Sequence, residues 1–348
     1  MKLLYYLPIL LCLAYTARGE EIEKDTAKIR NVELNEVVVQ SFKQQRDLRL
    51  EPLSASAVTG TAIQNRNITG IKEFSSFIPN LFMPDYGSKL TSPVYIRGIG
   101  SKINAPSVGL YVDGIPYFEK SAFDFDFNEV DRIEVLRGPQ GTLYGRNTLG
   151  GIINVYTKSP LKYEGTNVWL SNGSYGYRDY ALSHYKKIGE KFGYAISGDY
   201  RNSDGYFTNL FTDKKADDMK SGSARIRLEW KPQKNLSFGL MSSFDRSVQG
   251  GYPYAVCDSV THKPGEVDYS FYKRTLSTTG FSADFQGTGY SINSRTAFQY
   301  LSDHQGIDQD FSPRSIYFAR QDMKQKMFSE ELNIKSTTPG RYKWLFGA

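Results

Sequence analysis

The sequence predicts a mixed α/β domain followed by antiparallel transmembrane strands of a β-barrel that this chain does not complete. Two observations support this prediction. Residues 133–158 contain two short β-prone runs separated by a glycine-rich segment, which is typical of closely packed backbones. After Pro160, segments of about ten residues alternate apolar and polar side chains between polar turns, as the strands of a membrane barrel do.

Composition limits the classes of protein to which this chain can belong. The chain has 348 residues, enough for two ordinary domains, and 14% of them are aromatic, which suits β-structure with rings at membrane interfaces. Beyond the N-terminus no apolar run approaches the roughly 18 residues of a spanning helix, which excludes a helical membrane bundle. The net charge of +6 fits either an ordinary solvated surface or a basic lumen that attracts anionic cargo. The sequence contains no block of basic residues, so nucleic acid is not expected as a partner.

Residues 1–19 have the features of a secretory signal peptide. Lys2 supplies the positive start, residues 3–15 form a short apolar core, and Ala17-Arg18-Gly19 is a small-x-small cleavage site. Cys257 is then the single cysteine of the mature chain. We therefore expect an exported protein without an internal disulfide.

Residues 20–50 form a charged N-terminal arm with one β-prone run near its end. That run consists of Leu34, Asn35, Glu36, Val37, Val38 and Val39. It could be the first strand of the next domain, or an exposed strand that pairs edge-to-edge with a partner protein.

Residues 51–160 form the predicted α/β domain. Short helices are expected at residues 61–63 and 69–77, the second with Thr69 as N-cap. Asp113-Gly114 predicts a tight hairpin. Arg97 and Arg137 each precede a glycine at a strand end, where the plain interpretation is a solvated surface arginine.

Residues 161–348 form the predicted partial barrel, with about nine strands joined by alternating short and long connections. Its clearest strand lies at residues 224–230. One face of that strand is apolar (Ala224, Ile226, Leu228, Trp230) and the other is charged (Arg225, Arg227, Glu229). A water-filled lumen accepts such a charged face, whereas the alternative, a soluble β-sandwich, would bury it.

Three segments in the same order resemble one family. They are residues 93–100 (PVYIRGIG), 108–116 (VGLYVDGIP) and 133–158 (IEVLRGPQGTLYGRNTLGGIINVYTK). They are similar to the plug domain of TonB-dependent outer-membrane receptors, above all siderophore receptors of the yersiniabactin/pesticin type. The resemblance implies a location in the outer membrane of a Gram-negative cell, in contact with its lipid.

The resemblance also implies partners and site residues. The run at residues 34–39 would be a TonB box, which binds TonB with its ExbB/ExbD energy complex. Arg97 and Arg137 would form a latch between plug and barrel with Glu330 and Glu331, two acids on a strand similar to the one that supplies them in the family.

The function implied by the resemblance is import of a scarce, bulky ligand, with a ferric siderophore as the first choice. Candidate ligand contacts on plug loops are Tyr86, Lys89, Lys102 and Tyr117, each of which could equally be a plain loop residue. The alternatives are a cobalamin or glycan importer, or an outer-membrane binding or adhesion protein that transports nothing. We expect no enzyme, cofactor or metal site, because the three histidines are scattered and no Walker-type loop is present.

Length raises one further expectation. Plugged barrels have about 22 strands, and the residues after Pro160 are too few for them. The sequence analysis therefore predicts the N-terminal portion of a longer receptor.

Overall fold

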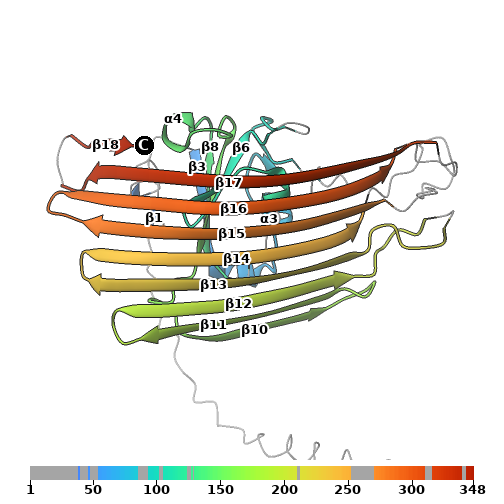
Figure 1. Cartoon of the computed structure of the whole chain (residues 1–348), viewed down its shortest axis with the longest axis horizontal. Coiled ribbons are helices and arrows are strands. Elements are labelled where there is room, and N and C mark those ends of the chain that lie inside the picture. The colour runs from blue at the N-terminus through green and yellow to red at the C-terminus, as the bar shows by residue number, and fades with distance from the viewer. Residues whose placement is uncertain are drawn as a thin grey trace, which may run out of the picture. The chain divides into compact units, whose positions relative to one another are not determined.

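The computed structural model of the chain describes residues 54–84, 93–101, 105–123, 127, 129–209, 212–251, 270–309, 316–338 and 342–348, and the backbone of residues 38–39 and 46–47. All of these belong to one compact unit, Val37–Ala348. Their principal sheets are a five-stranded sheet in a small domain and a nine-stranded sheet of long strands, shown in Figure 1.

The small domain combines short strands with short helices. Its sheet has the order β3-β8-β9-β6-β7, and β6 pairs with β9 in parallel while the other pairs are antiparallel. The strands are β3 (Ser54–Thr59), β6 (Val108–Val112), β7 (Ile115–Tyr117), β8 (Val130–Arg137) and β9 (Gly151–Thr157). The helices are α2 (Gly60–Asn65), α3 (Ile71–Ser75), η4 (Lys120–Phe123) and α4 (Gly141–Tyr144). A two-stranded sheet joins β4 (Leu81–Phe82) to β5 (Tyr95–Ile96).

Close backbone packing explains the glycines of this domain. Gly151 has φ +145, and a Cβ atom there would lie 2.2 Å from the Leu136 carbonyl oxygen. Only glycine fits such a position without displacing the neighbouring strand. Asp113 and Gly114 both have positive φ, +51 and +83, as the predicted tight hairpin between β6 and β7 requires.

The two predicted helices are present, but the expected cap of the second is wrong. Thr59 caps α2, accepting a hydrogen bond from the Ala62 amide at 3.3 Å. In α3 the N-cap is Gly70 rather than Thr69, and no side chain caps that helix. The extended Gly70 offers its carbonyl to the Phe74 amide at 3.0 Å, so Thr69 lies one residue too early.

The long sheet consists of neighbouring antiparallel strands in chain order (Figure 1). They are β10 (Gly165–Asn172), β11 (Arg178–Ile188), β12 (Phe192–Ser203), β13 (Met219–Gln233), β14 (Leu236–Gly250), β15 (Phe271–Gln286), β16 (Tyr290–Asp308), β17 (Phe318–Ser336) and β18 (Leu345–Gly347). The prediction of a mixed α/β domain followed by antiparallel barrel strands is confirmed.

Several of these strands are longer than the sequence predicts. β16 and β17 each have 19 residues, and their facing ends lie in a stretch expected to be a long loop. In those ends polar side chains occupy both faces, as with His304 and Gln305 or Gln321 and Asp322. Alternating hydrophobicity is lost there, so a pattern-based prediction ends the strand too early.

The two faces of the long sheet differ. On β13, Ile226 and Trp230 point away from the small domain and are 40% and 50% exposed, while Arg225 and Arg227 contact it. We call the end with connections 173–177, 204–218, 251–270 and 309–317 the loop end, and the end with 189–191, 234–235 and 287–289 the turn end. None of the helices in the described part of the chain is long and apolar enough to span a membrane.

Candidate functional site

The candidate functional site is the contact between the small domain and the inner face of the long sheet. Its centre is Asp113, which the β6–β7 turn places beside β13. The Asp113 carboxylate accepts hydrogen bonds from the Thr157 amide at 2.9 Å and the Thr157 hydroxyl at 2.7 Å, and forms an ion pair with Arg227 at 3.0 Å. Burial acts to raise the pKa of Asp113, but Arg227 and the Thr157 hydrogen bonds outweigh it and hold that pKa below its usual value.

The network extends along β13. Arg227 also pairs with Glu229, with 2.7 Å between Nη2 and Oε1. The other Glu229 oxygen accepts a hydrogen bond from the Ser159 hydroxyl at 2.5 Å. Asp113, Arg227, Glu229 and Ser159 thus join the small domain to the wall through one continuous polar chain.

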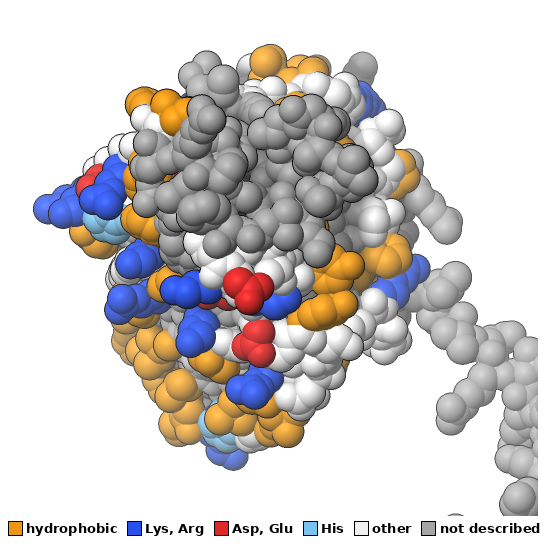
Figure 2. Space-filling view, turned by 90° about the vertical axis from the view of Figure 1, so that its right-hand side faces the viewer, with side chains coloured by type: hydrophobic (Ala, Val, Ile, Leu, Met, Phe, Trp, Pro, Cys, Tyr) orange, Lys and Arg blue, Asp and Glu red, His pale blue; other side chains and the backbone are white. Residues whose placement is uncertain are grey.

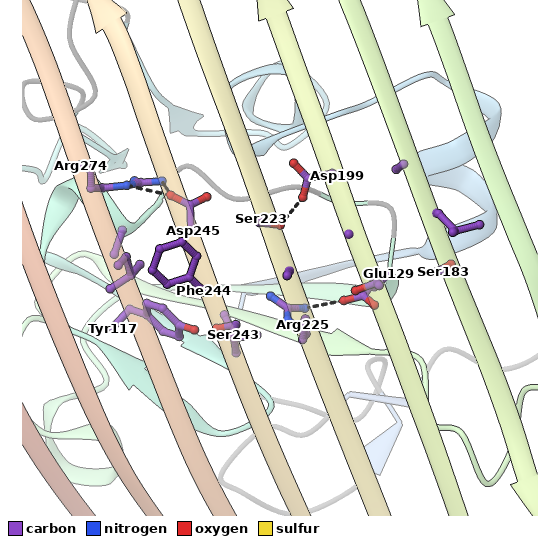
Figure 3. A pocket seen from close by; sticks show the side chains of 18 residues that line it. Tyr117, Glu129, Ser183, Asp199, Ser223, Arg225, Ser243, Phe244, Asp245 and Arg274 are labelled. Carbon is purple, nitrogen blue, oxygen red and sulfur yellow. Dashed lines mark hydrogen bonds and ion pairs between the residues drawn. The ribbon is translucent and has the colours of Figure 1, made fainter.

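A second ion pair lies one inward position along β13. Arg225 Nη1 is 3.0 Å from the Glu129 carboxylate of the small domain. The pair borders a cavity of about 50 Å³ that is also lined by Ser183, Asp199 and Ser243 (Figure 3). A cavity of this size, bordered by charged and hydroxyl side chains, has room for a few water molecules between the two surfaces.

A third attachment lies toward the loop end, at Arg274 of β15. Its guanidinium is 1% exposed, donates to the Ser121 carbonyl of η4, and pairs with Asp245 at 2.6 Å. Figure 3 shows Arg274 and Asp245 pointing toward each other from neighbouring strands. The neighbouring Tyr272 hydroxyl donates to Asp303 at 2.9 Å.

Apolar contacts complete the interface. Met241, Leu276 and Leu301 point inward from the long sheet and belong to the same buried cluster as the core of the small domain. Ile115 lies against Gly280, where a Cβ atom would be 2.1 Å from Ile115 Cδ1. Glycine at this position therefore makes room for a side chain of the small domain.

This arrangement is suited to docking rather than catalysis. Breaking one buried ion pair by removing one partner costs about 3–5 kcal/mol, whereas the intact pair adds little net stability. Such pairs hold a domain in one position, because leaving one charge buried alone is costly. When the whole domain moves and both charges enter water, the net cost in free energy is small. Among the described residues no three His, Cys, Asp or Glu side chains are placed to hold a metal ion.

The comparisons with known proteins identify the two parts. Residues 47–152 match the family model of the TonB-dependent Receptor Plug Domain. The small domain matches the plug of a TonB-dependent receptor, and we call it the plug. The long sheet has the fold of part of such a receptor's barrel wall, and we call it the wall.

Curated relatives match the plug region. The pesticin receptor of Yersinia pestis is 33% identical over 126 residues, 36% of this chain and 19% of the relative. A pesticin receptor of Yersinia enterocolitica is 33% identical over 125 residues. The chain thus spans about a fifth of the length of these relatives.

Solved structures match both parts of the fold. The ferric yersiniabactin uptake receptor of Yersinia pestis has a TM-score of 0.76 at 20% identity, covering 85% of this chain and 47% of that one. The ferripyoverdine receptor of Pseudomonas aeruginosa has a TM-score of 0.72 at 17% identity, covering 88% and 42%. At such identities the likeness is one of fold.

The predicted latch between Arg97, Arg137, Glu330 and Glu331 is not formed. Arg137 donates within the plug, to the Ser54 hydroxyl at 3.0 Å and the Pro79 carbonyl at 2.9 Å. Burial and the neighbouring Arg97 lower the pKa of Arg137. Within the described ranges neither arginine forms an ion pair with Glu330 or Glu331.

Strand alternation separates the two glutamates. Glu331 pairs in register with Arg295 on the inward face and lines the space beside the plug. Glu330 points outward, where it accepts hydrogen bonds from the hydroxyls of Ser294 at 3.2 Å and of Thr296. Neighbouring residues of a strand lie on opposite faces, so both could not have faced one partner.

The other predicted site residues are the candidate ligand contacts and the predicted TonB box. Tyr117 lies in β7 and is 6% exposed, so the expectation of an accessible loop contact is wrong for this residue. Tyr86, Lys89 and Lys102 lie outside the described residues, as do residues 34–37. Val38 and Val39 form β1 (Val38–Val39), which pairs with β2 (Arg46–Asp47).

Asp113 and Glu129 were not predicted from the sequence as docking residues. Asp113 was interpreted only as a residue of the β6–β7 turn. The turn needs only the backbone of Asp113, which has positive φ, so its side chain is available for the ion pair with Arg227. The charged face of β13 was recognised, but its partners in the plug are 70 residues or more away in sequence, and 96 in the pair of Glu129 and Arg225. No local pattern indicates that pairing.

Proposed function

We propose that this receptor imports a scarce, bulky ligand, a ferric siderophore, through energised rearrangement of its plug. The observation that carries the proposal is the contact of plug and wall through ion pairs, as in the Asp113–Arg227 pair beside a small cavity. An intact ion pair adds little net stability, so moving both of its partners into water together has a small net cost. The solved structures of similar fold include receptors named for ferric yersiniabactin and ferripyoverdine, which supports a siderophore as the ligand.

The energy source in this proposal is TonB with its ExbB/ExbD complex. Residues 34–39 would serve as the TonB box, an extended segment whose backbone pairs with a strand of the partner. Traction on this arm would reach the plug at β3, which follows the arm in the chain and is the edge strand of the plug sheet, paired with β8. No catalytic step is part of this mechanism.

The experiment that tests the proposal separates binding from uptake. Val38→Pro removes one backbone donor from the box and fixes its φ, which opposes strand pairing. In cells, we expect energised uptake of radiolabelled ferric siderophore to be lost while binding at the cell surface is retained. Val38→Thr, which keeps β-propensity, is the control and should transport normally.

The outcomes also separate the alternatives. A receptor that only binds or adheres would be indifferent to Val38→Pro in every assay, which would contradict the transport proposal. Uptake of cobalamin or a glycan, with no uptake of a ferric siderophore, would contradict the ligand but keep the mechanism.

A further inference from the structure

Three side chains on the outward face of the wall are arranged as a serine, a histidine and an aspartate in sequence of contact. Ser302 and His304 are two residues apart on β16, so they point to the same side of the sheet. Strand register places Asp322 of β17 directly opposite His304. That side is the outward one, because Phe298 shares it and is 48% exposed, whereas Asp303 on the opposite face is 2% exposed.

The hydrogen bonds of this group have the pattern that activation of a serine needs. The Ser302 hydroxyl is 3.2 Å from Nε2 of His304, and Nδ1 of His304 is 2.7 Å from the Asp322 carboxylate. An ionised carboxylate only accepts hydrogen bonds, so Nδ1 carries the proton and Nε2 is left as the base for the serine. Both distances lie within the range of about 2.6–3.2 Å for a nucleophile and its base.

Burial differs between the serine and the histidine. Ser302 is 7% exposed, whereas the side chain of His304 is 42% exposed. The hydroxyl is therefore shielded from bulk water, which strengthens its hydrogen bond to the ring. A substrate approaches it from the side of His304.

Donors for a developing negative charge lie on both neighbouring strands. Register pairs Ser302 with Thr275 of β15 and with Lys324 of β17, and all three side chains are on the outward face. Side chains opposite each other on neighbouring strands have Cβ atoms about 4.5–5.5 Å apart. The Thr275 hydroxyl and the long Lys324 side chain can therefore reach the oxygen of a tetrahedral intermediate formed on Ser302.

The surroundings of the group indicate the class of substrate. Phe298 and Phe328 are paired in register on the outward face and are 48% and 70% exposed. Phe298 lies two outward positions from Ser302 along β16, which is roughly 14 Å. An acyl chain in contact with these rings would leave its ester carbonyl beside Ser302. Figure 2, viewed onto the loop end, shows histidine, acidic and basic side chains gathered with hydrophobic ones at the left margin.

We propose that Ser302, His304 and Asp322 hydrolyse a carboxylic ester of a long acyl chain. Ser302 Oγ attacks the carbonyl carbon while Nε2 of His304 takes the hydroxyl proton. The bond from that carbon to the alcohol oxygen then breaks, and Nε2 returns the proton to the leaving alcohol. A water molecule, deprotonated by the same nitrogen, attacks the acyl-serine, which releases the fatty acid and restores the serine hydroxyl.

The three residues have different roles in this reaction. Ser302 and His304 are catalytic residues, because they touch the reacting atoms. Asp322 is a positioning residue that acts through His304, by holding the proton on Nδ1. The activity does not depend on import of a ligand and goes beyond the proposed function.

The test is hydrolysis of p-nitrophenyl laurate by the whole chain in a non-ionic detergent, with p-nitrophenyl acetate as the short-chain comparison. We expect a higher kcat/KM for the laurate, because only its chain reaches the phenylalanine rings. Ser302→Ala, purified in the same way, should lower kcat by at least about a hundredfold. His184→Ala is the matched control. His184 is a histidine of β11 that is bonded to the Thr166 hydroxyl, so its loss should leave the rate unchanged.

Asp322→Asn separates positioning from a structural role. An asparagine amide can donate to Nδ1, which moves the ring proton to Nε2 and removes the base. We expect kcat to fall by at least about a hundredfold while KM for the laurate stays the same. Asp322→Glu, which keeps a carboxylate, should retain part of the activity. If the bond only stabilised the sheet, kcat of the folded Asp322→Asn protein would be unchanged.

A second measurement needs no substitution. A fluorophosphonate that carries a decyl chain is attacked at phosphorus by an activated serine, with loss of fluoride, and peptide mass spectrometry locates the adduct. We expect the adduct on Ser302. A phospholipid in mixed micelles serves as a further substrate: its cleavage would identify membrane lipid as the source of the ester, and cleavage of the laurate alone would identify a soluble ester.

Three results would overturn the proposal. The first is hydrolysis of the laurate at the same rate by the unmodified chain and by Ser302→Ala, which would assign the activity to another source. The second is a fluorophosphonate adduct that is absent from Ser302. The third is a higher kcat/KM for the acetate than for the laurate, which would contradict the long acyl chain.

Discussion

The plug sheet and the barrel wall distribute apolar side chains in opposite ways. In β6 every residue is buried, and in β9 six of seven are, so both faces of these strands lie in the interior; Asn154 and Thr157 are the buried polar side chains of β9. In β13 no residue is fully buried, and apolar and charged side chains alternate. The plug is stabilised by its own core, whereas the wall depends on a different environment on each side.

This difference identifies which contacts can change. The plug core is closely packed and continues into Met241, Leu276 and Leu301 of the wall. The rest of the surface between plug and wall depends on a few ion pairs beside a small cavity. Movement of the plug relative to the wall should therefore begin at this surface.

The largest expected effect comes from making the same Ile→Ala change in the plug core and on the outer face of the wall. Ile153→Ala removes a fully buried side chain of the plug core and should lower the free energy of unfolding by about 2–5 kcal/mol. Ile226→Ala, at a side chain 40% exposed on the outer face, should cost less than about 1 kcal/mol. Urea denaturation of the chain in detergent measures both. Equal costs would mean that the two sheets are not built differently.

The second effect concerns the ion pair between the two sheets. Arg227→Ala leaves Asp113 buried without its cation and should destabilise plug docking by about 3–5 kcal/mol. Arg137→Ala removes hydrogen bonds to neutral groups inside the plug and should cost about 1–2 kcal/mol without affecting docking. Limited proteolysis of the plug reports docking, because this ion pair joins Asp113 of the plug to Arg227 of the wall. Faster cleavage of the plug in Arg137→Ala than in Arg227→Ala would contradict this assignment.

The third effect is a pH dependence of docking. The pKa of Asp113 is lowered in the folded protein, so its ionised form stabilises the contact above the unfolded pKa of about 3.9. This stabilisation should be lost as pH falls through the lower, folded pKa. Cleavage of the plug by an acid-stable protease, normalised to cleavage of an unfolded peptide at the same pH, should increase below about pH 4. In Asp113→Asn this acid-dependent increase should be absent, and its persistence there would assign it to another group.

The smallest effect separates the two neighbouring glutamates. Glu330 is on the outer face and bonded only to hydroxyl groups in the described contacts, so Glu330→Leu should change stability by less than about 1 kcal/mol. Protease protection of the plug should remain at its normal level. Loss of that protection would restore a docking role for Glu330 and contradict its outward placement.

Much of this architecture follows from local sequence. Alternation in residues 224–230 predicts both faces of β13 correctly, because water and lipid impose a period of two on a strand. The Asp113-Gly114 pair predicts its hairpin, because few residues accept positive φ. The latch prediction failed because a resemblance assigned partners to Arg97 and Arg137, while a two-residue strand period had already placed Glu330 and Glu331 on opposite faces.

The sequence by itself determined which strands exist, which of their faces is apolar, and that the chain has two unlike parts. Only the tertiary structure decided which charges meet: Asp113 with Arg227, Glu129 with Arg225, and the Ser121 carbonyl with Arg274. The physical reason is that periodicity is set locally by the solvent on each face. An ion pair between distant segments depends instead on how two folded surfaces align, and no short window of sequence encodes that alignment.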